Sequence, residues 1–103
     1  MKARVKLRPV LFACAGCPQH GYLAPQVAAL LDARNVAELT PLSAQGVEKA
    51  RARFPVFTLE GCERACARQW LGDYGVRPRR CDMLSDFHAA DAGQLADEIA
   101  ARW

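Results

Sequence analysis

The sequence has no long apolar run and no block of like charges. No apolar stretch approaches the roughly 18 residues that a membrane-spanning helix needs, so we do not expect a membrane protein. Lys and Arg number 14 against 11 Asp and Glu, and the net charge of +3 is scattered along the chain rather than gathered into a run. A dedicated nucleic-acid-binding surface is therefore not indicated. The composition also argues against collagen, coiled coil and disorder.

Glycine-rich and low-complexity segments are absent too. The chain has 7 Gly and 6 Pro, with no internal repeat and no linker. The Ala15-Gly16 turn has too little glycine for a phosphate-binding loop, which also requires a Lys before Ser or Thr, so nucleotide binding is not supported. With 103 residues, 51% of them hydrophobic, the chain is expected to form one domain over residues 1–103.

The amino-terminal residues resemble an export signal only faintly. Basic residues up to Arg8 precede an apolar stretch, Val10 to Ala13, that ends at Cys14. An export signal needs roughly 7 to 15 apolar residues, and this stretch has four, closed on one side by Pro9. We therefore expect a mature cytoplasmic protein. Five cysteines in a reducing compartment indicate metal or thiol chemistry rather than structural disulfides.

Short apolar runs alternate with stripes of helical periodicity along the whole chain. The expected strands are Val5–Ala13, Val36–Leu39, Val56–Leu59 and Cys81–Phe87. The expected helices carry the stripes Leu23/Val27/Leu30/Leu31, Val47/Ala50/Phe54, Cys66/Trp70/Tyr74 and Leu95/Ile99/Trp103. This alternation predicts an α/β fold, a small three-layer structure with a parallel sheet of about four strands and helices on both faces.

Four of the cysteines form two pairs at equivalent corners of this fold. Cys14 and Cys17 follow the first strand, and Cys62 and Cys66 follow the third. In the common small doubly wound order these strands are neighbours, and ligands bind at the carboxyl ends of the strands. C-x-x-C lets a turn aim both sulfurs at one centre, and a spacing of four puts two sulfurs on one helix face. We therefore predict a four-cysteine metal site at the carboxyl ends of strands one and three.

The chemistry of four thiolates favours zinc. Helix starts stabilise the thiolate form, and soft sulfur ligands select zinc or an iron–sulfur cluster over magnesium, calcium or manganese. Zinc is the simpler choice, and an iron–sulfur electron carrier is an alternative. A second alternative is a thiol–disulfide oxidoreductase that uses the Cys14/Cys17 pair, with Cys14 as the exposed attacking sulfur. A third is that each cysteine is only a small buried apolar residue. No catalytic residues and no partner protein are identified.

Residues near the predicted site have lesser roles in this interpretation. His20 could replace one thiolate or cover the site, and Asp86 and His88, at the end of the fourth strand, could support the ligands from outside. Cys81 begins that strand, so six residues place it roughly 20 Å from the metal edge in a structural role.

Two pairs on the third expected helix are interpreted as structural or solvated. Trp70 and Tyr74 have the spacing of a core stripe. Arg64 and Arg68 lie four apart, where a solvated helix face is favoured over an anion site.

These motifs resemble the DGC domain family, small bacterial and archaeal proteins described as zinc-binding and without an established reaction. The resemblance runs from about Val10 to His88 and lies in Cys14-Ala15-Gly16-Cys17, Gly21, Leu23, Ala24, Val27, Gly61-Cys62, Cys66 and Leu84-Ser85-Asp86. It implies zinc bound by four cysteines. The motif that names the family has Glu60 here in place of Asp, which keeps the charge and changes its reach.

Overall fold

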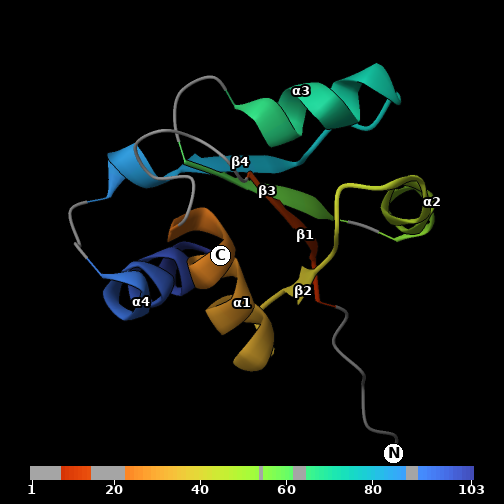
Figure 1. Cartoon of the computed structure of the whole chain (residues 1–103). Coiled ribbons are helices and arrows are strands. Elements are labelled where there is room, and N and C mark those ends of the chain that lie inside the picture. Colours follow the sequence, from red (N-terminus) through yellow and green to blue (C-terminus); the bar gives the residue numbers. More distant parts are fainter. Residues whose placement is uncertain (1–7, 15–22, 54, 62–64, 88–90) are drawn as a thin grey trace, which may run out of the picture.

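Four strands alternate with four helices in a computed structural model of the chain, which describes residues 8–14, 23–53, 55–61, 65–87 and 91–103 (Figure 1). The strands are β1 (Val10–Ala13), β2 (Glu38–Leu39), β3 (Val56–Glu60) and β4 (Arg80–Met83). The helices are α1 (Leu23–Ala33), α2 (Ala44–Ala52), α3 (Cys66–Asp73) and α4 (Ala92–Arg102), and a short 3-10 helix covers Leu84–Asp86. None of the helices in the described segments is long and apolar enough to cross a membrane.

The four strands form one parallel sheet in the order β2-β1-β3-β4. In the central pair, Val10 of β1 lies opposite Val56 of β3, and Ala13 lies opposite Leu59. The first and third strands are therefore neighbours, as the sequence predicts. The carboxyl ends of β1 and β3 meet at the same edge of the sheet.

Helices cover both faces of the sheet, so the predicted three-layer architecture is confirmed (Figure 1). Side chains alternate along β1, with Leu11 on the face covered by α1 and α4, and Val10 and Phe12 on the face covered by α2 and α3. One buried cluster contains Leu11, Ala24, Val27, Ala28, Leu31, Ala37, Leu59, Leu84, Phe87, Leu95, Ala96 and Ile99. The other contains Val10, Phe12, Cys14, Val47, Ala50, Val56, Ala67, Leu71 and Val76.

Two of the helices begin with conventional side-chain caps. Ser43 Oγ accepts a hydrogen bond from Gly46 N at 3.1 Å at the start of α2, and Asp91 Oδ1 accepts one from Gln94 N at 2.9 Å at the start of α4. Gly46 is required by close packing, because a Cβ atom there would lie 2.2 Å from the carbonyl oxygen of Pro41. The start of α3 is built differently and forms part of the candidate site.

The fourth strand is shorter than the sequence pattern indicates. The strand was expected to run to Phe87, but β4 ends at Met83 and the chain turns into the 3-10 helix. Leu84 and Phe87 are buried against α1 and α4 from this turn. A run of apolar residues marks burial, and burial does not require an extended backbone. Val5, Leu7 and Phe54 lie outside the described residues.

The expected core stripe on α3 is only partly correct. Trp70 is partly buried and packs against the second cluster. Tyr74 is 44% exposed, so its assignment to the core is wrong. The ring of Tyr74 instead packs on that of Trp70, with a centroid distance of 4.7 Å. Helix α3 ends at Asp73, so Tyr74 follows the helix and does not extend its buried face.

Candidate metal centre

Cys14 lies directly after β1 at the carboxyl edge of the sheet. Its backbone N–H donates a hydrogen bond to the carbonyl of Leu59 at 2.9 Å, which extends the ladder between β1 and β3 by one residue. Cys14 therefore lies beside Glu60, the last residue of β3. Its side chain is in the cluster beneath α2 and α3, and the residue is only 2% exposed. The oxidoreductase alternative needs an exposed attacking sulfur at this position, and that expectation is wrong.

Cys66 is the first residue of α3 and is exposed. The preceding residue, Ala65, has a left-handed backbone with φ of 52°, which turns the chain into the helix. Ala67, the next residue along, is hydrogen bonded to Glu60 at the end of β3. Cys66 therefore lies near the same carboxyl edge and on the same face of the sheet as Cys14.

Glu60 joins these two parts of the site. Its carboxylate is fully buried, and its two oxygens accept hydrogen bonds from the backbone N–H groups of Ala67 and Arg68, each at 3.1 Å. These amides belong to the second and third residues of α3, the positions that a helix N-cap usually satisfies. A carboxylate at this place also interacts favourably with the positive end of the helix dipole.

The sequence does contain a signal for this role. Ala65 stands where a Ser, Thr, Asp or Asn would cap the helix, so the first amides of α3 must find an acceptor elsewhere. Glu60, the last residue of β3, is one of the two acids that shortly precede these amides in the sequence. The fold is needed to show that its carboxylate points back to the helix.

Cys81 contacts the same carboxylate. It pairs with Thr58 in the ladder between β3 and β4, and its Sγ lies 3.8 Å from Glu60 Oε2. Burial raises the pKa of the Cys81 thiol, and the negative charge of Glu60 adds to this effect, while the Thr58 hydroxyl opposes it. Cys81 is therefore held as a neutral thiol.

The position of Cys81 differs from the expectation. Because β4 ends at Met83, opposite Glu60, Cys81 is two residues from the carboxyl edge rather than six. The separation along the strand is thus about 7 Å rather than 20 Å. The predicted distance is wrong, although Cys81 does lie within the sheet on the start of β4.

The other residues proposed near the site from the sequence are exposed or lie outside the described residues. Asp86 is exposed in the 3-10 helix and not at the end of a strand. The side chain of Arg68 is exposed, as expected for a solvated helix face. Cys17, Cys62, His20, Arg64 and His88 lie outside the described residues.

The described donor groups form only part of a metal site. Over the ranges that the structure describes, no three His, Cys, Asp or Glu side chains gather closely enough to hold an ion by themselves. Two sulfur donors, Cys14 and Cys66, do lie at one edge of the sheet, and Cys66 is exposed at the start of α3. Sulfur donors of this kind suit a soft metal such as zinc.

Comparison with known proteins identifies the family. The model of the DGC domain matches residues 10–102, so the chain belongs to the DGC domain family, as its motifs indicate. Among curated proteins, the anaerobic and virulence modulator AnvM of Pseudomonas aeruginosa is 32% identical to this chain over 107 aligned positions. The alignment covers 88% of this chain and 82% of AnvM. No solved structure matches the chain.

Proposed function

We propose that this protein binds one zinc ion through the thiolates of Cys14, Cys17, Cys62 and Cys66. The observation that carries the proposal is that Cys14 and Cys66 both lie near Glu60, at one edge of the sheet and on one face. The parallel pairing of β1 with β3 brings Cys14 and Cys66, which are far apart in the sequence, to the same edge of the sheet.

The other two cysteines are tethered close to this point by the chain itself. Cys17 is three residues from Cys14, and Cys62 is two residues from Glu60. At about 3.5 Å per residue, their Cα atoms are within roughly 10 Å of described residues of the site. These short tethers allow the Cys17 and Cys62 thiols to approach an ion at this edge, where a zinc–sulfur bond is about 2.3 Å.

A site closed by four thiolates is of the structural kind, because no coordination position stays open for a substrate. Bound zinc would supply a covalent tie between the chain after β1 and the chain after β3. The related AnvM is named as a modulator, and we propose a modulatory rather than a catalytic role for this chain as well.

The metal content of protein purified without added metal tests this proposal. Elemental analysis is expected to find one zinc per chain, with loss of the zinc in Cys62→Ser and in the matching variants of Cys14, Cys17 and Cys66. Cys81→Ser serves as the control, because Cys81 is a half-buried neutral thiol outside the four proposed ligands, and its replacement should leave the zinc content unchanged. Full retention of zinc by all four ligand variants would exclude the site. A visible absorption band with iron in place of zinc would favour the iron–sulfur alternative.

A further inference from the structure

Helix α3 begins without a cap of its own. Its N-cap residue is Ala65, which has no side-chain acceptor, whereas α2 and α4 are capped by Ser43 and Asp91. The first N–H groups of a helix have no partner within the helix, and leaving them unsatisfied in a buried position is costly. Ala67, the second residue of α3, is fully buried, so water does not satisfy its amide.

Glu60 provides the missing cap from a different element. Its two carboxylate oxygens accept one hydrogen bond each from Ala67 N and Arg68 N, both at 3.1 Å, and its side chain is 0% exposed. Since Glu60 is the last residue of β3, these bonds fasten the start of α3 to the carboxyl end of a central strand. The Cys81 thiol is the third group on the carboxylate, with Sγ at 3.8 Å from Oε2.

We propose that Glu60 is a positioning residue of the thiol site, which fixes where Cys66 lies relative to Cys14. Cys66 immediately precedes the first amide that Glu60 holds, and Cys14 lies beside Glu60 on the neighbouring strand. The inference rests on the proposed zinc site for its functional consequence. The capping role itself depends only on the described contacts.

The two-oxygen geometry makes the prediction specific. Glu60→Gln leaves one acceptor oxygen and turns an NH2 group toward a backbone N–H, so one of the two helix bonds is lost and replaced by a repulsive contact. Glu60→Asp keeps both oxygens and the charge but is shorter by one methylene, so the helix start must move toward the strand. We therefore expect the start of α3 to be disturbed less in Glu60→Asp than in Glu60→Gln, each compared with the wild type.

A control must separate positioning from a general loss of stability. Ile99→Ala removes buried volume beneath α4, on the opposite face of the sheet from α3. This variant destabilises the fold without contact to Glu60, Cys14 or Cys66. It therefore shows what reduced stability alone does to the site.

Two measurements on the full chain test the proposal. In metal-free protein, hydrogen exchange of the Ala67 and Arg68 amides is expected to quicken at least tenfold in Glu60→Gln, beyond any change in Ile99→Ala. In competition with a chromophoric chelator, zinc affinity is expected to fall 10- to 100-fold in Glu60→Gln, the range for lost outer contacts to metal ligands. Glu60→Asp should fall between, and Ile99→Ala should keep the affinity of the wild type.

The outcomes distinguish the two proposals. Unchanged amide exchange in Glu60→Gln overturns the positioning role, even if the wild-type protein binds zinc. Absence of zinc binding by the wild type overturns the proposed function, and the exchange rates of the Ala67 and Arg68 amides then still decide the role of Glu60. If Glu60→Gln does not fold, Glu60→Asp carries the same comparisons, and an affinity and exchange equal to the wild type in that variant overturn the positioning role.

Discussion

Burial decides what each of the described cysteines can do. Cys14 is 2% exposed among apolar side chains, Cys66 is exposed at a helix start, and Cys81 is half-buried on the edge strand β4. Burial raises the pKa of the Cys81 thiol, so Cys81 stays neutral, whereas the exposed Cys66 is accessible to a metal ion. The same residue type is therefore suited to a metal at one position and to packing at another.

The raised pKa of Cys81 predicts how stability depends on pH. An unfolded cysteine titrates near pH 8.5, and the folded protein favours the neutral thiol, so the stabilising contribution is complete below about pH 8.5 and is lost as the pH rises through the higher pKa of the folded state. We expect the free energy of unfolding, measured with urea, to fall above about pH 8.5. In Cys81→Ala this fall should be smaller, and the variant should lose about 1 kcal/mol at pH 7. An identical pH dependence in both proteins would contradict the prediction.

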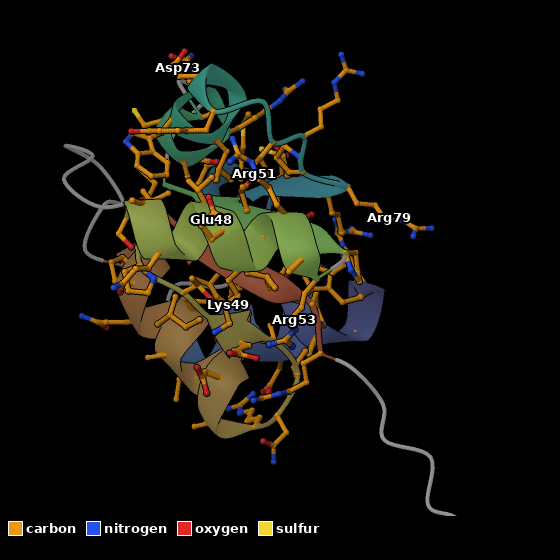
Figure 2. All side chains as sticks on the ribbon, turned by 90° about the vertical axis from the view of Figure 1, so that its right-hand side faces the viewer. Glu48, Lys49, Arg51, Arg53, Asp73 and Arg79 are labelled. Carbon is orange, nitrogen blue, oxygen red and sulfur yellow. The ribbon has the colours of Figure 1, made fainter. Side chains whose placement is uncertain are left out.

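At the scale of elements, helix α2 is attached to the sheet by charge as well as by packing. Glu38 of β2 pairs with Lys49 and with Arg53, the latter at 2.5 Å. Figure 2 shows Lys49 and Arg53 on one side of α2 and Arg51 on the other. Arg51 donates a hydrogen bond to the carbonyl of Tyr74 at 2.6 Å. The helix is therefore connected to β2 on one side and to the end of α3 on the other.

Replacement of Glu38 is expected to loosen α2. Hydrogen bonds from Lys49 and Arg53 lower the pKa of Glu38, so its contribution to stability is present above its ordinary pKa of about 4.3 and is lost as the pH falls through the lower folded value. Glu38→Gln should cost about 1 kcal/mol at pH 7 and nearly nothing at pH 2, as measured by urea unfolding. Glu48→Gln is the matched control, because Glu48 forms only an exposed pair with Arg51 and should cost less than about 0.5 kcal/mol. Equal losses in the two variants at pH 7 would contradict this account.

At the scale of the whole molecule, the last helix secures the edge strand. Trp103 Nε1 donates a hydrogen bond to Asp82 of β4 at 2.8 Å, and its ring packs edge-on against Phe57 of β3 at 4.8 Å. Asp82 also receives two hydrogen bonds from Arg80. Trp103 therefore ties the end of α4 to two neighbouring strands, one of which has no strand beyond it.

Substitution of Trp103 separates these two contributions. Trp103→Ala removes both the ring and the donor, and we expect a loss of about 2 to 3 kcal/mol in the free energy of unfolding. Trp103→Phe keeps a ring against Phe57 but removes the hydrogen bond to Asp82, so it should lose about 1 kcal/mol. Both are measured by urea unfolding followed by circular dichroism. A Trp103→Phe variant as unstable as Trp103→Ala would show that the hydrogen bond, and not the packing, holds the edge strand.

The sequence by itself determined the fold class and the adjacency of the first and third strands. Apolar strands alternate with amphipathic helices, and this periodicity allows few arrangements other than a parallel sheet covered on both faces. The expected adjacency of the first and third strands followed from that rule and is confirmed by the pairing of Val10 with Val56.

Only the tertiary structure decided the length of β4, the exposure of Tyr74 and the role of Glu60. The apolar character of Leu84 and Phe87 predicts that both side chains are buried, but it does not predict the backbone conformation. An extended strand and a short turn can bury them equally well. Glu60 in sequence is one acid before a glycine, and its two partners lie seven and eight residues further along. Hydrogen bonds of this kind depend on where a strand end and a helix start meet in space, and local periodicity contains no information on that meeting.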